Sequence, residues 1–220
     1  KLTDEKTDNG SFPWLSHKSI KLCGEDTRVL KVSYAGEKGF EIHVHNNSMK
    51  KIYDELVQHG ENFNLIHFGM LALDSMRLEK NYRSWKSDLT SDYTMLQSGL
   101  EKWIKFDKGN FIGKEALKNE FDLGTSKKFV TLVVDDPEDN KPFGEPVYLS
   151  PVFAGDDYLG PIVSSGYGHR VKKSISMAIL DDRNLNGLND QLYIDVLGRK
   201  RKAYIVNEAL YDPENLKLRS

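Results

Sequence analysis

The sequence contains 220 residues, and its 31 lysines and arginines nearly balance 33 aspartates and glutamates to give a formal net charge of −2. This balance excludes a general electrostatic attraction to nucleic acids or anionic membranes, and no apolar run approaches the roughly 20 residues of a membrane helix. Hydrophobic residues make up 39% of the chain, which is enough for a packed core, and the single cysteine, Cys23, excludes an internal disulfide framework.

Two strands around a glycine-containing turn are predicted in the first quarter of the chain. Residues 1–16 have no clear period and are predicted to be a connecting segment. Apolar and polar residues alternate over residues 28–34 and again over 40–45, which is the pattern of half-buried strands. Gly36 and Gly39 provide the backbone conformations of the turn.

The register of this hairpin decides whether Tyr34 and Glu41 can act together, and the sequence leaves two registers open. If Tyr34 pairs with Phe40, the apolar faces coincide and Glu41 points the other way. If Tyr34 lies opposite Glu41, through a glycine bulge in the turn, the two side chains share one face. Spacing alone favours a solvated Glu41, and a carboxylate that binds a ligand beside Tyr34 is the alternative.

Two helices are predicted after the hairpin. Residues 49–57 place apolar side chains at i, i+3, i+4, i+7 and i+8, the stripe of an amphipathic helix, which Asn47 or Ser48 can cap and Gly60 can end. The second helix is predicted over residues 67–79. Its apolar residues cover much of its circumference, so burial on more than one side is expected.

The character of the chain changes near residues 121–127. Before this point, residues 80–98 are predicted to be irregular, 103–106 to form a strand and 112–119 a short helix. After it, six short β-rich runs separated by turn residues predict a small barrel or sandwich. These runs are Phe129–Val134, Pro146–Leu149, Gly160–Ser164, Ser174–Ile179, Gln191–Val196 and Arg201–Val206.

Arg77 is the most unusual charged residue, because it lies at the end of the second apolar helix, where a buried guanidinium requires a partner. Asp74 at i−3 is a local partner, and an arginine that reaches into a pocket is the alternative. No metal site is expected. His43 and His45 share a strand face, but the sequence offers no convincing third ligand.

Several motifs, taken in order, resemble those of one known family. Tyr-Ala-Gly-Glu-Lys-Gly-Phe-Glu at residues 34–41 resembles the Tyr-Thr-Gly-Glu-x-Gly-Phe/Trp-Glu motif of the glycine cleavage T-protein (aminomethyltransferase) family. Ser-Met-Arg-Leu-Glu-Lys at 75–80 resembles its Arg-Leu-Glu motif, and Phe-Ile-Gly-Lys-Glu-Ala-Leu at 111–117 resembles the stretch before its C-terminal barrel. Further motifs resemble the branch of sarcosine and dimethylglycine dehydrogenases, which is fused behind a flavin domain. They lie at residues 12–14, 82–85, 166–170 and 210–215.

The resemblance implies an α+β fold in two parts. Residues 1–124 would be the C-terminal part of the family's folate-binding α/β domain, and residues 125–220 its antiparallel β-barrel domain. The implied cofactor is tetrahydrofolate, onto which the family moves a one-carbon unit from an amine. FAD would belong to the parent enzyme of the fused branch and not to this chain.

The resemblance also implies roles for individual residues. Glu41 matches the glutamate that binds the pterin, whose ring N–H and amino group can both donate to one carboxylate. Tyr34 matches the tyrosine paired with that glutamate. Arg77 matches the arginine that lines the pocket, and Trp85 forms an aromatic wall where many family members have tyrosine.

The family's catalytic aspartate is expected upstream of Lys1, so the sequence is interpreted as a C-terminal fragment without a complete catalytic apparatus. The expected partners are folate and a small methylated amine or aminomethyl donor. The expected location is the mitochondrial matrix in a eukaryote and the cytoplasm in a bacterium. The alternatives are a stand-alone aminomethyltransferase, a folate-binding protein without transfer activity and a β-barrel interaction module.

Overall fold

The computed structural model describes residues 2–135, 144–182, 185 and 192–220. The chain divides into two compact units, which are described separately. The first unit contains residues 1–77 together with 212–220, and the second contains residues 78–211. Two separate segments of the chain thus build the first unit. The domain boundary expected between residues 124 and 125 stays a prediction.

An antiparallel sheet forms the centre of the first unit, with strands in the order β1 (His17–Leu22), β2 (Glu25–Leu30) and β3 (Glu41–Val44). Cys23 and Gly24 connect β1 to β2, and both have positive φ, 53° and 81°. A two-residue connection of this kind matches the right-handed twist of the paired strands. Strand β1 was not predicted from the sequence; it begins directly after the predicted connecting segment.

The buried face of β2 is formed by Thr27 and Val29, and the buried phase continues to Lys31. The prediction of a strand over residues 28–34 is therefore wrong beyond residue 30, where the chain leaves the sheet. Both registers considered for the hairpin are also wrong, because Glu41 pairs with Leu30. The reason is that residues 31–40 form a long connection, named the Tyr34 loop below, instead of a tight turn.

Helix α1 (Asn46–Gly60) confirms the first predicted helix and ends at Gly60, before the short 3₁₀-helix η1 (Glu61–Phe63). Its N-cap is His45 and not Asn47 or Ser48, because the extended backbone at His45 lets its ring nitrogen accept a hydrogen bond from the Asn47 N–H at 3.4 Å.

Helix α2 (Met70–Glu79) begins three residues later than predicted. The expected burial holds at its end, where Arg77, Leu78 and Glu79 are buried, but Met70 is 70% exposed. The boundary between the two units falls inside this helix, after Arg77.

Residues 80–98 of the second unit form turns, as the sequence predicts. The strand predicted over residues 103–106 is absent from this described segment, because the 3₁₀-helix η2 (Glu101–Trp103) and a turn occupy it. Helix α3 (Lys114–Leu123) is the short helix predicted before the barrel, displaced by a few residues.

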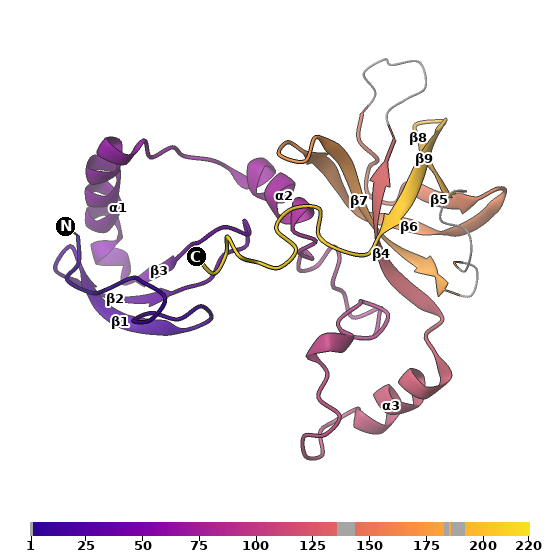
Figure 1. The fold of residues 1–220 in the computed structure, drawn as a ribbon, viewed down its shortest axis with the longest axis horizontal. Helices are drawn as coiled ribbons and strands as arrows, with labels where there is room; N and C mark the ends of the chain where they lie inside the picture. The colour runs from indigo at the N-terminus through magenta and orange to yellow at the C-terminus, as the bar shows by residue number, and fades with distance from the viewer. Residues whose placement is uncertain (1, 136–143, 183–184, 186–191) are drawn as a thin grey trace. The chain divides into compact units, whose positions relative to one another are not determined.

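Six antiparallel strands close the barrel of the second unit in the order β4-β7-β6-β5-β8-β9 (Figure 1). The predicted barrel is thereby confirmed. The run at residues 146–149 is not a strand, and β5 takes its place in the barrel. Gln191, at the start of another predicted run, lies outside the described residues. The strands are β4 (Lys127–Val134), β5 (Pro151–Ala154), β6 (Asp157–Gly168), β7 (Lys173–Asp181), β8 (Leu192–Val196) and β9 (Arg199–Val206).

The barrel interior contains side chains that are completely removed from solvent, such as Leu132, Ile162 and Leu180. A second cluster joins Leu78 of α2 to Phe129 and other buried residues on the barrel wall. Among the described residues, no helix has both the length and the apolar character needed to cross a membrane.

Candidate functional site

The Tyr34 loop (residues 31–40) is anchored to the segment that precedes β1. The Lys31 N–H donates to the Ser16 carbonyl at 3.0 Å, and the Leu15 N–H donates to the Lys31 carbonyl at 3.1 Å. Gly36 has a φ of 78°, and a side chain at Gly39 would press within 3.1 Å of the Val32 carbonyl oxygen. Gly36 thus has the left-handed conformation that glycine favours, and a side chain at Gly39 would require its neighbours to shift.

A buried lysine supports the base of the loop. Lys31 is 1% exposed, and its ammonium donates a hydrogen bond to the side-chain oxygen of Asn9. Its Nζ lies 6.0 Å from the ring centre of Phe40, whose ring in turn packs 5.7 Å from that of the buried Phe12. Burial is the main cause that lowers the pKa of Lys31, and the charge of Lys38 adds to it. This support fixes the loop immediately before Glu41.

Glu41 and Tyr34 are both exposed residues of the first unit. Tyr34 lies in the loop and is 36% exposed. Glu41 is the first residue of β3 and is exposed, with its Oε2 3.4 Å from Nε2 of His43. Because Ile42 pairs with Val29 on the buried face, Glu41 and His43 lie on the opposite face of the sheet.

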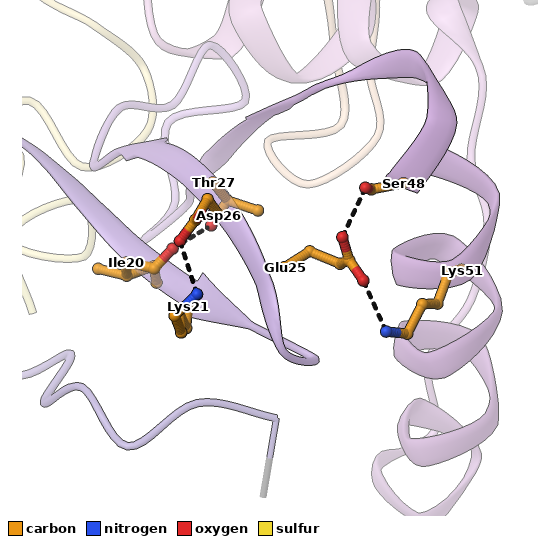
Figure 2. Close-up of polar contacts among 7 residues, drawn as sticks. All are labelled: Ile20, Lys21, Glu25, Asp26, Thr27, Ser48 and Lys51. Carbon is orange, nitrogen blue, oxygen red and sulfur yellow. Dashed lines mark hydrogen bonds and ion pairs between the residues drawn. The ribbon is translucent and has the colours of Figure 1, made fainter.

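The buried face of the sheet holds a different carboxylate, that of Glu25, which contacts α1 (Figure 2). Its two oxygens accept hydrogen bonds from the Ser48 hydroxyl at 2.6 Å and the Lys51 ammonium at 2.7 Å. The Lys51 hydrogen bond, followed by that of Ser48, lowers the pKa of Glu25, and the same contact raises the pKa of Lys51. Glu25 thus has a structural role in joining the sheet to α1, whereas Glu41 lies on the face of the sheet opposite this helix.

An open hollow of about 790 Å³ lies over the sheet, and neither Tyr34 nor Glu41 lines it. Its walls include Ser19, Lys21, Arg28 and His43. Within the described part of the chain, no group of three or more histidine, cysteine or acidic side chains could hold a metal ion.

Arg77 is 4% exposed, and its Nε donates to Oδ1 of Asp74 at 3.1 Å. The local pairing considered from the sequence is therefore present. Trp85 belongs to the second unit and is 77% exposed. Because the two units are described separately, the meeting of Trp85 with Tyr34 and Glu41 in one pocket stays a prediction.

The glutamate of the Arg-Leu-Glu motif has a structural role that the sequence analysis missed. Glu79 is 3% exposed, and its Oε1 accepts hydrogen bonds from the N–H groups of Arg170 at 2.7 Å and Val171 at 3.2 Å. These N–H groups belong to the turn between β6 and β7, so Glu79 attaches the end of α2 to the barrel. Its contacts are about 90 residues away in the chain, and no local pattern signals them.

Lys31 and Asp88 are further supporting residues that the sequence analysis missed. Lys31 lies in the same phase as the buried Thr27 and Val29, but the apolar alternation of Leu30 and Val32 indicated the opposite face, so periodicity gave no signal for it. Asp88 is completely buried and lies in the turn that carries Trp85. Nothing in the local sequence distinguishes it from an exposed turn aspartate.

Two family models match the chain. The GCVT N-terminal domain matches residues 1–108, and the glycine cleavage T-protein C-terminal barrel domain matches residues 127–212. Human mitochondrial dimethylglycine dehydrogenase is 30% identical over 96% of this chain and 24% of its own length. An aminomethyltransferase from Thermoanaerobacter sp. (strain X514) is 30% identical over 96% of this chain and 55% of its own length.

A solved structure shares the fold. The aminomethyltransferase T of the glycine cleavage system from Bartonella henselae superimposes with a TM-score of 0.76, at 18% identity, over 91% of this chain and 53% of that one. The chain thus spans between about a quarter and about half of the length of these relatives.

Proposed function

Since this chain belongs to the glycine cleavage T-protein (aminomethyltransferase) family, we propose that it forms one wall of a tetrahydrofolate site in a one-carbon transferase. The position of Glu41 carries this proposal. Its carboxylate is exposed on the face of β3 opposite α1, directly after a loop held by buried residues. A carboxylate in this setting is available to a ligand and is kept in place by the backbone behind it.

The chemistry of the donor set fits a pterin. A pterin presents a ring N–H and an amino group side by side, and an ionised carboxylate accepts both with charge-assisted hydrogen bonds. Tyr34 supplies a ring face and a hydroxyl from the same loop. Arg77 and Trp85 occupy the positions that correspond to the family's pocket arginine and aromatic wall. Tetrahydrofolate, when bound, supplies the atoms that accept the one-carbon unit.

The parent protein that we favour is a flavin-linked demethylating enzyme of the sarcosine or dimethylglycine dehydrogenase type, with this chain as its C-terminal part. FAD and the catalytic aspartate would then lie in other parts of the polypeptide. A stand-alone aminomethyltransferase is the second candidate, favoured by the relatives of which the chain covers about half. A glycine-rich flavin-binding motif far upstream in the same reading frame selects the first candidate, and its absence there selects the second.

Glutamine at position 41 tests the folate assignment in the parent enzyme. Glu41→Gln replaces one acceptor oxygen with a donor that faces the donors of the pterin. Tetrahydrofolate binding should weaken by about 2–4 kcal/mol, on the order of 30- to 1000-fold. Glu61→Gln makes the same change at an exposed glutamate of the first unit and serves as the control. Equal folate affinity in Glu41→Gln and the unmodified enzyme would show that Glu41 is only a solvated strand residue.

The 220-residue chain alone should not catalyse the transfer, because the proposed catalytic aspartate lies outside it. Methylenetetrahydrofolate formation from tetrahydrofolate and an aminomethyl donor measures this directly. A turnover of roughly 1–1000 per second, the ordinary range for enzymes, would place the catalytic group inside this chain and contradict the proposal.

A further inference from the structure

Residues 84–89, named the Trp85 turn, form a compact loop around an exposed aromatic ring. The Ser84 carbonyl accepts hydrogen bonds from the N–H groups of Asp88 at 3.0 Å and Leu89 at 3.1 Å, and the Lys86 N–H donates to the Leu89 carbonyl at 3.1 Å. Lys86 has a φ of 74°, in the left-handed region. The turn is therefore closed by its own backbone, and Trp85 projects from it with 77% of its surface exposed.

The carboxylate of Asp88 joins this turn to the barrel. Asp88 is 0% exposed, and its Oδ2 accepts a hydrogen bond from the Ser84 N–H at 2.7 Å. Its Oδ1 accepts from the hydroxyl of Ser87 at 3.3 Å and from the hydroxyl of Ser164 on strand β6. One buried side chain thus connects the first residue of the turn to a barrel strand that lies 76 residues further along the chain.

A buried negative charge at the base of a turn requires compensation. Besides accepting hydrogen bonds, Asp88 interacts electrostatically with Arg83 and affects the pKa of the Arg83 guanidinium. Burial lowers the pKa of Arg83, and the negative charges of Glu101 and Asp88 act in the opposite direction. The Arg83 guanidinium stacks on the ring of Phe129 at 4.2 Å, so this cation is also attached to the barrel wall. Arg83 before Trp85 and Asp88 after it are therefore both attached to the barrel.

We propose that Asp88, together with Ser164, is a positioning residue that holds the Trp85 turn in one conformation, so that the indole ring is a preformed wall for an aromatic ring of tetrahydrofolate. A ring that is already in place binds a ligand without the entropic cost of ordering the turn. The inference rests on the proposed function for the identity of the ligand. The attachment of the turn through Asp88 is tested without any ligand.

Fluorine NMR of the 220-residue chain labelled with 5-fluorotryptophan tests the attachment. The three tryptophans give three resonances, and Trp85→Phe identifies that of Trp85. Asp88→Ala and the milder Ser164→Ala should shift and narrow the Trp85 resonance, because the turn gains freedom, and should leave Trp14 and Trp103 unchanged. Asp88→Asn, which retains an acceptor for the Ser84 N–H, should restore part of the original spectrum.

Ser176→Ala is the matched control. Ser176 lies on the neighbouring strand β7 and is 0% exposed, and its hydroxyl has no hydrogen-bond partner in the described part of the chain. It should leave the Trp85 resonance in place. The attachment is refuted if Ser164→Ala and Asp88→Ala, in a folded chain, leave the Trp85 resonance where it was.

Titration of the parent enzyme with tetrahydrofolate tests the consequence for binding. Loss of a stacking ring should weaken binding on the order of 5- to 100-fold in Trp85→Ala, and Asp88→Ala should cause part of that loss. In the Trp85→Ala background, Asp88→Ala should have no further effect, because the ring that it positions is gone. A further loss of similar size in that background would overturn the positioning role.

The two proposals fail in different ways. If Trp85→Ala leaves the tetrahydrofolate affinity unchanged, the assignment of Trp85 to the folate site is wrong. The proposal that Asp88 positions Trp85 for tetrahydrofolate is then wrong as well. If Trp85→Ala weakens binding but Asp88→Ala changes neither the spectrum nor the affinity, the folate assignment stands and the role of Asp88 is wrong.

Discussion

The two units of the chain are built in different ways. In the barrel, each of the six strands pairs with two neighbours, and most of the interior is filled by residues of those same strands, such as Leu132 and Ile162. In the first unit, β1 and β3 are the edges of the described sheet. The buried hydrophobic side chains of this unit come from segments far apart in the sequence. They are Phe12, Leu22, Val29, Ile52 and Leu218.

This difference separates the barrel scaffold from two of the proposed ligand-binding residues, Tyr34 and Glu41, whereas Trp85 belongs to the same unit as the barrel. The barrel closes through its own backbone hydrogen bonds, which removes exposed strand edges. Tyr34 and Glu41 lie in the unit that depends on contributions from the N-terminal segment and the last residues of the chain. Changes in the barrel should therefore affect overall stability most, whereas changes around the Tyr34 loop should act locally.

The largest expected effect follows from the closest approach in the barrel. A Cβ at Gly160 would overlap the carbonyl oxygen of Ile179 on β7, which is backbone and cannot rotate away. Gly160→Ala should therefore lower the free energy of unfolding of the barrel by at least about 3 kcal/mol. Urea unfolding followed by circular dichroism measures this change.

Gly155→Ala is the control for this prediction. A Cβ there meets no atom within 4 Å, and its φ of 61° leaves only the cost of a left-handed backbone, about 1 kcal/mol. Equal losses in the two variants would contradict the view that tight strand packing at Gly160 supports the barrel.

A smaller and local effect is expected in the tail of the chain, residues 212–220, which belongs to the first unit. Leu218 is 1% exposed, and Leu216, two residues earlier, is 66% exposed. Leu218→Ala should destabilise the first unit by about 2–4 kcal/mol, and Leu216→Ala should have little effect. Hydrogen exchange of amides in β2 and in the barrel distinguishes the units. If Leu218→Ala increases the exchange rates of barrel amides more than those of β2 amides, the view that residues 212–220 stabilise the first unit is contradicted.

The smallest effect concerns pH and the contact of Glu25 with Ser48 and Lys51. The pKa of Glu25 is lowered in the folded state, so its contribution is complete above its usual value near 4.5 and is lost as the pH falls through the lowered value. The raised pKa of Lys51 gives a contribution that is present below about 10.5 and lost as the pH rises through the raised value. Between these limits the contact should be constant.

Glu25→Gln tests this contact. It should remove part of the acid dependence of the first unit's stability and leave that of the barrel unchanged. Urea midpoints between pH 5 and pH 2, read for each unit from resolved amide resonances, are the measurement. An unchanged acid dependence of the first unit would mean that this contact contributes nothing measurable.

The barrel could be predicted from the sequence because β4 and β7 contain runs of residues that favour strands and are buried on both faces. Residues 129–134 and 174–179 retain their strand character whatever their partners, since both faces of these runs are buried. Strand β1 could not be predicted in the same way. It contains only two apolar residues, Ile20 and Leu22, among lysines and other polar residues, and its pairing with β2 decides its conformation.

The Tyr34 loop shows how a correct motif can accompany an incorrect geometry. Tyr34 and Glu41 were singled out by their resemblance to a family motif, but the alternation of Leu30 and Val32 indicated the wrong buried face. Lys31 occupies the buried phase because Asn9 accepts its hydrogen bond, and this contact spans 22 residues. Periodicity reports the chemistry of side chains and carries no information about such distant partners, so a buried lysine breaks it.

The contribution of residues 212–220 to the first unit has a consequence for synthesis on the ribosome. These residues are translated after the whole barrel, so Arg219 can reach Trp14 and Asn9 only when the barrel has already emerged. Domains generally fold as units during translation, at about 5–20 residues added per second. The nascent first unit must therefore wait, without Leu218 in its core, through the synthesis of more than half of the chain. A chaperone that recognises exposed apolar side chains would meet it in that interval.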